Sequence, residues 1–330
     1  MRRRQFLALL GSMAIGCPAD AVAQKPDQVR RIGVLMPLKT GDALGLRRAR
    51  IFTQALQDLG WTDGQNIRID YRWSGGDIEQ MQSLAKELVG SRPDVLVGIA
   101  QAPTAALQQA TRTIPIVFLM VSDPVAGGIV ESLARPGGNA TGFFSAEPSL
   151  GGKWLELLKE IVPGLRRVAV IFNPETSTGG TSYLHSVERA APLFSVEAIG
   201  APVHHAGDIE LAISSHVREP GGGLIVLPDA FTASHLKQII ELAARYKLPA
   251  IYAVSDFANE GGLMAYGTDP FELYGRTASY VDKILTGANP ANLPVQAPTK
   301  FALVINLKTA KTLGLTVPPS LLDRADELIE

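Results

Sequence analysis

Short apolar runs alternate along this chain with longer stretches in which apolar residues recur every three or four positions. The first half carries four such runs, rich in Val, Ile and Leu, at residues 31–36, 67–73, 95–100 and 116–121. Helical patterns lie between and after them, at residues 45–59, 78–89, 103–111 and 124–133. Runs that are apolar on both faces are typical of buried parallel strands joined by crossover helices.

The same alternation begins again in the second half of the chain. Predicted strands lie at residues 168–172, 196–199, 224–227 and 250–253, and predicted helices at 150–161, 182–194, 209–217 and 234–246. A short strand at 261–267, a helix at 271–285, an extended stretch at 294–305 and a helical tail follow. Two successive arrays of similar length predict an α/β protein with two doubly wound parallel-sheet lobes.

A closed (β/α)8 barrel is the competing fold for this order of elements. The turn-rich segment at residues 136–142 (PGGNATG) separates the two arrays, where an unbroken barrel would need a further βα unit. The segment therefore favours two lobes.

The first residues combine three arginines at 2–4, an apolar run at 6–16 and the triplet AVA at 21–23. This arrangement predicts a signal peptide of residues 1–23 and a periplasmic mature protein. The paired arginines also fit a twin-arginine signal, so the sequence leaves the two export routes open. Cys17 loosely resembles a lipidation site, but the AVA triplet is the better match to a cleavage site.

Composition limits the classes of function. Removing residues 1–23 takes three arginines and one aspartate from 31 basic and 32 acidic residues, which leaves 307 residues with a formal net charge of −3. That charge excludes a strongly basic nucleic-acid binder, and the length exceeds what one hydrophobic core usually organises. Because Cys17 is the only cysteine, the mature chain has no disulfide and no thiolate chemistry.

The usual enzyme signatures were not found. The chain has no G-x-x-x-x-G-K-[ST] phosphate loop, no G-x-G-x-x-G after the first strand and no G-x-S-x-G elbow. His204 and His205 are adjacent near a strand, so their side chains point to opposite faces and do not chelate one metal ion. We expect no metal and no cofactor. An exported hydrolase stays an alternative, since catalytic triads have no fixed spacing.

Candidate binding residues follow the predicted strands, because ligands of open parallel sheets bind at the carboxyl ends of the strands. The expected ligand-binding residues are Gln101, Ala102, Thr104, Ser122, Asp123, Asn173, Asp229 and Tyr252. Asp123 and Asn173 have an equally good explanation as helix caps. Tyr252 would stack on a ligand or lie in the core.

Several segments resemble those of a known family. They read RIGVLMP, LGWTDGQNIRIDYRW, IPIVFLMVSDPVAGGIVESLARPGGNATG, LPAIYAVSDFANEGGLMAYG and PTKFALVINLKTAKTLGLTVPPSLLDRADELIE. Over essentially the whole mature chain, the sequence is similar to the periplasmic substrate-binding proteins of ABC transporters, in the family that includes tryptophan- and aromatic-amino-acid-type binding proteins.

The resemblance implies a type I periplasmic-binding fold, with two lobes joined by a three-crossover hinge. On that pattern, residues 29–144 plus 265–290 form one lobe and residues 145–264 plus 291–330 the other. It also implies a monomer that binds a small polar or amino-acid-like ligand, works with an ABC permease and an ATPase, binds no nucleic acid and catalyses no reaction.

For an amino-acid ligand, the resemblance implies that Thr104 and Ser122, with nearby N–H groups, take the carboxylate and that Asp229 pairs with the ammonium group. A periplasmic ligand sensor built on the same fold is the main alternative to a transport protein.

Overall fold

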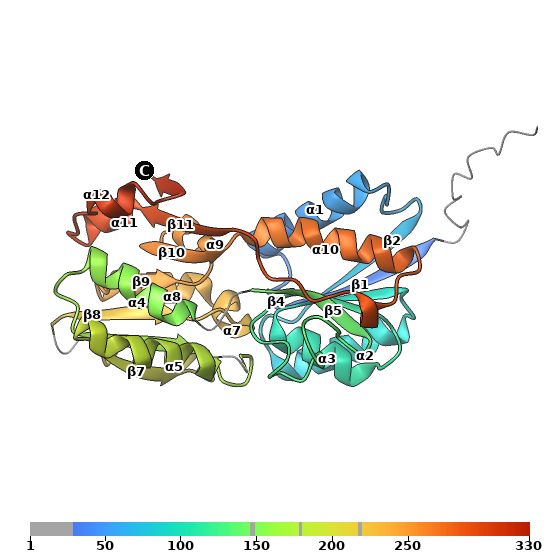
Figure 1. Cartoon of the computed structure of the whole chain (residues 1–330), viewed down its shortest axis with the longest axis horizontal. Helices are drawn as coiled ribbons and strands as arrows, with labels where there is room; N and C mark the ends of the chain where they lie inside the picture. Colours follow the sequence, from blue (N-terminus) through green and yellow to red (C-terminus); the bar gives the residue numbers. More distant parts are fainter. Residues whose placement is uncertain (1–28, 146–148, 178–179, 217–219) are drawn as a thin grey trace, which may run out of the picture.

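The structure, a computed structural model, describes residues 29–145, 149–177, 180–216 and 220–330. Two α/β lobes lie side by side along its long axis (Figure 1). The predicted signal peptide and the last residue of the helix predicted at 209–217 lie outside the described residues.

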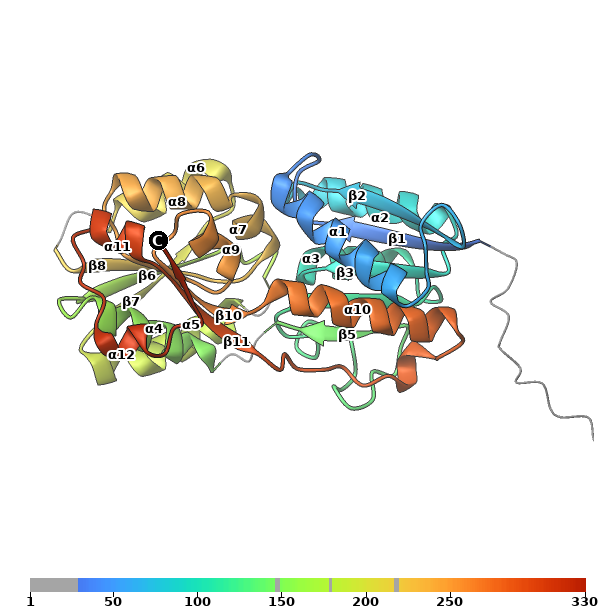
Figure 2. The ribbon, with the colours of Figure 1, turned by 90° about the horizontal axis from the view of Figure 1, so that it is seen from above.

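The first lobe is built on a five-stranded parallel sheet of order β2-β1-β3-β4-β5. Its strands are β1 (Arg30–Met36), β2 (Ile67–Trp73), β3 (Val95–Ile99), β4 (Ile116–Val121) and β5 (Ala140–Phe144). Its helices are α1 (Ala43–Asp58), α2 (Ile78–Gly90), α3 (Gln101–Ala110) and α10 (Pro270–Leu285). Helices α1 and α10 lie side by side over one face (Figure 2), and α2 and α3 pack together over the other.

The second lobe holds a seven-stranded sheet of order β12-β11-β10-β9-β8-β6-β7, parallel except where β10 meets β11. Its strands are β6 (Arg167–Phe172), β7 (Glu197–Pro202), β8 (Gly222–Val226), β9 (Ala250–Tyr252), β10 (Met264–Thr268), β11 (Phe301–Asn306) and β12 (Glu327–Ile329). Its helices are α4 (Leu150–Ile161), α5 (Gly180–Ala190), α6 (Ala206–Ser214), α7 (Ala230–Ser234), α8 (Leu236–Arg245), α9 (Ser255–Asn259), α11 (Leu307–Thr312) and α12 (Pro319–Leu322). The short 3-10 helix η1 (Ala191–Phe194) belongs to this lobe, whereas the 3-10 helix η2 (Pro290–Asn292) packs against β5 of the first lobe.

The apolar runs of the sequence form the buried centres of both sheets. Every residue of β3 and β8 is buried, because helices cover both faces of each sheet. The predicted fold class, two doubly wound parallel-sheet lobes, is confirmed, and the competing barrel is wrong because the strands form two separate open sheets.

One predicted helix is wrong. Residues 124–133 form a series of turns, in which Gly128 has a φ of 66° and Asp123 accepts hydrogen bonds from the N–H groups of Val125 and Ala126. The sequence pattern predicts only turns at residues 136–142, but residues 140–142 are the first three residues of β5. Both errors arise where glycines interrupt the periodic pattern.

Three chain segments cross between the lobes, and hydrogen bonds tie them together. The segment after β5 meets the one after β10 where the Thr268 hydroxyl donates to the Ser145 carbonyl. The third segment runs beside β5, since Thr141 donates to the Leu293 carbonyl at 2.6 Å. The second sheet includes β10 as far as Thr268, and residues up to Gln296 lie against β5. These two crossings therefore fall a few residues beyond the predicted boundaries at 265 and 290.

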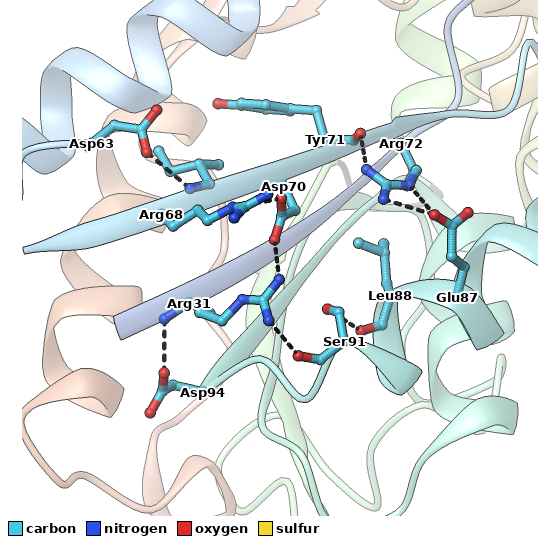
Figure 3. Close-up of polar contacts among 11 residues, drawn as sticks. Arg31, Asp63, Arg68, Asp70, Tyr71, Arg72, Glu87, Leu88, Ser91 and Asp94 are labelled. Carbon is cyan, nitrogen blue, oxygen red and sulfur yellow. Dashed lines mark hydrogen bonds and ion pairs between the residues drawn. The ribbon is translucent and has the colours of Figure 1, made fainter. Parts of the chain in front are cut away.

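The outer edge of the first sheet is protected by charges. Strand β2 lies at the edge of the sheet beside β1, and its side chains form ion pairs with neighbouring elements (Figure 3). Asp70 accepts from Arg31 at 2.9 Å and from Arg68 at 3.2 Å, and Arg72 reaches Glu87 of α2 at 2.7 Å. Partial burial would raise the pKa of Asp70, but the two arginines outweigh it and lower that pKa. Charged edge strands resist pairing with other chains.

Candidate functional site

A buried cavity lies between the lobes, at the carboxyl ends of strands from both sheets. The first lobe contributes Leu44 and Arg48 of α1 and the residues after β3 and β4, and the second lobe contributes residues that follow β8 and β9. Its volume is about 30 Å³, the space of about one water molecule. Its walls are mostly apolar, with Ile99, Leu236 and Phe257 among them.

Two residues of the first-lobe wall have unusual backbone conformations. Ala100 at the end of β3 has a φ of 72°, and Met120 in β4 has a φ of 58°. Met120 lies where the register between β4 and β5 shifts. A non-glycine residue in such a sparsely populated backbone conformation costs about 1–3 kcal/mol, and such strain is concentrated at functional sites. Both strained residues line the cavity.

An ion pair crosses the cavity from one lobe to the other. Nη2 of Arg48, on α1, donates to Oδ2 of Asp256, in the first turn of α9. Each of these residues is only 2% exposed. Burial alone would lower the pKa of Arg48, but the Asp256 carboxylate outweighs it and raises that pKa, so the guanidinium stays charged. The two lobes thus bring opposite charges together at one buried point.

Asp229, the other carboxylate of the cavity wall, is held entirely by its own lobe. It accepts hydrogen bonds from the N–H of Thr232 at 2.7 Å, the N–H of Asn173 at 3.1 Å and the hydroxyl of Thr176 at 3.2 Å. Burial raises its pKa to about 6, although these donors oppose the rise. The side chain caps α7 and joins the loops after β6 and β8.

Of the residues predicted from the sequence, Gln101, Ser122 and Asp229 line the cavity. Gln101 is 4% exposed, and its Oε1 has no hydrogen-bond partner within the described residues. The Ser122 hydroxyl lies 3.5 Å from the carbonyl oxygen of Pro228, across the interface between the lobes. Thus the loops after β3, β4 and β8 do meet.

The other predicted residues do not line this cavity. Thr104 is fully buried and donates to the Ala100 carbonyl at 2.7 Å, one turn back in α3, and Ala102 packs against the core of the first lobe. Asp123 caps the turn that follows it. Asn173 caps its own turn by accepting from the N–H of Glu175 at 2.8 Å. These four residues lie in the predicted loops and helix starts, but there they form local hydrogen bonds or core contacts.

Tyr252 lies in the core of the second lobe. Its ring stacks on Phe257, with centroids 4.6 Å apart, and the residue is 1% exposed. Burial raises its pKa. Tyr252 does not line the cavity between the lobes, although Phe257, on which its ring stacks, does.

Sequence reasoning missed the ion pair and several apolar wall residues. A usable signal was present for Arg48: the buried face of α1 comprises Gly45, Arg48, Phe52 and Leu56, so a cation occupies a position of the apolar stripe. Asp256 carried no such signal, because α9 is only five residues long.

A wider groove of about 600 Å³ lies outside the cavity and also spans both lobes. Lys39 and residues 75–79 form its first-lobe side, and Asn173, His204, His205 and His235 lie on its second-lobe side. Thr176 lines both the groove and the cavity. Within the described residues, no group of three or more His, Cys, Asp or Glu side chains is arranged to hold a metal ion.

The lobes touch around the cavity. Leu44 of α1 packs against the core of the second lobe, and Ala230 of α7 belongs to a core cluster of the first. Gly76, in the loop after β2, is so close to Ser234 of α7 that a Cβ there would overlap the serine hydroxyl. The lobes are therefore closed over the cavity.

Two open parallel sheets, three crossings and a cavity shared by both lobes define the class of two-lobed proteins with the type I periplasmic-binding fold. Residues 31–329 match the family described as ABC transporter substrate binding protein. The chain belongs to this family, as the sequence resemblance predicted.

Three known proteins are similar to this chain over most of its length. A tyrosine-binding protein of Clostridioides difficile is 29% identical over 80% of this chain and 75% of its own length. An ABC domain from Streptococcus pneumonia, solved in complex with L-Trp, has a TM-score of 0.83 at 26% identity, covering 91% of this chain and 99% of that one. A substrate binding protein with adhesive properties from Clostridium difficile, in a ligand-free, open structure, has a TM-score of 0.65 at 27% identity over the same shares.

No helix in the parts of the chain that the structure describes is long and apolar enough to cross a membrane.

Proposed function

We propose that this protein is the periplasmic solute-binding component of an ABC importer, which captures a small polar or amino-acid-like ligand between its lobes. The observation that carries this proposal is the buried cavity whose walls and ion pair come from both lobes. The relatives described as binding tyrosine or solved with L-Trp favour an amino acid over other small solutes.

Ligand capture requires the lobes to move apart and close again. Sites for small ligands occupy about 300–1,000 Å³, ten times or more the volume of this cavity. The tied crossings would act as the hinge. The comparison supports this motion: two relatives of nearly equal identity have TM-scores of 0.83 and 0.65, and the lower score belongs to the structure described as open.

Closure needs no chemical step. A ligand that contacts both lobes binds the closed form more tightly than the open form and so shifts the population toward closure. A permease with its ATPase would then recognise the closed monomer and accept the unchanged ligand. Export through the predicted signal peptide would place the protein where it meets its solute.

The test is a binding screen of the mature chain, residues 24–330. Melting temperature is measured with each of the twenty amino acids and with a set of sugars as matched neutral solutes. We expect one or a few amino acids to stabilise the protein, by about 2.7 kcal/mol at a concentration of 100 times Kd. Mass spectrometry of the recovered ligand should show it unchanged.

Small-angle scattering then tests the motion. Ligand should reduce the radius of gyration, because closure brings the lobes together. Stabilisation by sugars alone would contradict the ligand class, and chemical conversion of a ligand would contradict a pure binding role.

A further inference from the structure

The charged groups of the cavity are not equivalent. Among the described residues that line it, Arg48 is the one cation, and Asp229 and Asp256 are the carboxylates. The three donors that hold Asp229 all come from its own lobe. Asp256 differs, because the side chain that pairs with it, Arg48, comes from the opposite lobe. Opening of the lobes would therefore separate Arg48 from Asp256 but leave Asp229 with its donors.

The cavity wall also contains hydrogen-bonding atoms without partners. Arg48 Nε and Gln101 Oε1 are buried and have no hydrogen-bond partner within the described residues. One is a donor and the other an acceptor. Buried polar groups are normally satisfied, so an unused donor and an unused acceptor on two residues that line one cavity point to a ligand that supplies both complements.

Charge balance narrows the class of that ligand. A ligand with a single charge that paired with Arg48 or Asp256 would leave the other group buried without a partner, which is strongly unfavourable. A zwitterion brings one charge of each sign, so Arg48 and Asp256 both stay paired and the net charge of the site does not change.

We propose that Arg48 binds the carboxylate, and Asp256 together with Gln101 the ammonium group, of an α-amino-acid zwitterion. This inference deepens the proposed function and rests on it. It replaces Asp229 by Asp256 as the partner of the ammonium group, and it makes the pair of opposite charges, one from each lobe, the element that selects amino acids.

The test combines protein variants with ligand analogues in a thermodynamic cycle. The probes are L-tyrosine, tyramine, which lacks the carboxylate, and 3-(4-hydroxyphenyl)propionate, which lacks the ammonium group. If L-tryptophan is the better ligand in the screen, tryptamine and indole-3-propionate take their places. Dissociation constants are measured by calorimetry for the wild type, Asp256→Asn and Arg48→Gln.

The expected pattern is selective. Asp256→Asn should weaken binding of the amino acid and of the amine about tenfold or more, and change binding of the propionate by less than about threefold. Arg48→Gln should do the reverse, weakening the amino acid and the propionate and sparing the amine. A simple latch between the lobes predicts something else: equal losses for all three probes, which would overturn the proposal.

Asp229→Asn is measured in the same cycle. Coupling between the ammonium group and Asp229 in place of Asp256 would overturn the assignment. Melting of each variant without ligand checks folding, and Asp256→Glu and Arg48→Lys serve as second variants that keep the charge: they should weaken binding but keep the preference for the zwitterion.

The failure of this inference can be told from that of the proposed function. If no amino acid binds the wild type, the proposed function fails and this assignment with it. If the wild type binds an amino acid but the cycle shows no selective coupling, the assignment alone fails.

Discussion

Gly76→Ala should hinder closure of the lobes without touching the cavity. Gly76 lies in the loop after β2, which the first lobe holds through the hydrogen bond from Gly75 N–H to the Leu38 carbonyl at 3.1 Å. An added Cβ would overlap Ser234 Oγ of the second lobe and lie 3.2 Å from Ser234 Cβ. The overlap exists only when the lobes are closed.

The free-energy cost of closing the lobes in Gly76→Ala depends on how the Ser234 side chain must move. Rotating the Ser234 hydroxyl removes its hydrogen bond to the Phe231 carbonyl, 2.8 Å long, and its hydrogen bond with Nδ1 of His235, 3.0 Å long. A hydrogen bond of this kind is worth about 1 kcal/mol. The short contact with Ser234 Cβ remains after that rotation. We expect a total of about 1–2 kcal/mol against closure, which is a 5- to 30-fold weaker affinity for the ligand.

Gly75→Ala is the matched control. Gly75 and Gly76 have φ values of 61° and 84°, so alanine introduces similar backbone strain at both positions. At Gly75, however, the new Cβ would meet Lys39 Cγ at 3.2 Å, a contact within the first lobe. Both variants should therefore lose similar stability, but only Gly76→Ala should lose affinity.

Calorimetry with the best amino acid of the screen and scattering with and without it provide the measurements. The double variant Gly76→Ala, Ser234→Ala should recover the part of the lost affinity that the hydroxyl causes, because only the 3.2 Å contact with the Cβ of residue 234 then remains. Equal affinities of the Gly75 and Gly76 variants would refute the reasoning, since the loop after β2 would then not approach α7 when ligand is bound.

Three further predictions concern pH and processing. Burial raises the pKa of Asp229 to about 6 from an unfolded value near 3.8, so between those pH values the native state binds more protons, and the free energy of unfolding falls as pH rises, by up to about 1.4 kcal/mol per pH unit. Urea unfolding between pH 4 and 7 should show this pH dependence, and Asp229→Asn should remove it. If the pH dependence is the same in the variant, the shifted pKa of Asp229 is refuted. The lowered pKa of Asp70 has the opposite sign: Asp70→Asn should cost about 1 kcal/mol at pH 7 and nothing at acid pH where the carboxyl is protonated, whereas an equal difference at both pH values would contradict an ionic cause. Finally, the intact mass of the exported protein should correspond to a chain that starts at Gln24, and a lipidated Cys17 at the N-terminus would contradict the predicted cleavage site.

Much of the fold could be predicted because its strands and helices depend on residues that are close together in the sequence. Buried parallel strands need apolar side chains on both faces, so β3, β4, β6 and β8 stand out as short runs of Val, Ile and Leu. Where glycines replaced the pattern, prediction failed, as it did at residues 124–133 and in β5.

The candidate site was only partly predictable. Strand ends indicate which loops face a ligand, and this placed Gln101, Ser122 and Asp229 at the cavity. The same rule does not say which side chain in a loop points to the cavity and which caps a turn. Local hydrogen bonds to the backbone occupy the side chains of Thr104, Asp123 and Asn173, and the last two cap turns.

The sequence by itself determined two arrays of strands and helices and the likeness to a family, since both depend on residues that are near one another in the chain. Only the tertiary structure decided that Arg48 meets Asp256, 208 positions away, across the cavity. Neither residue has an opposite charge three or four positions away in the sequence that would mark it as one half of an ion pair. Their meeting depends on how two separately folded lobes are held by three crossings, and that geometry arises from packing, which no local pattern records.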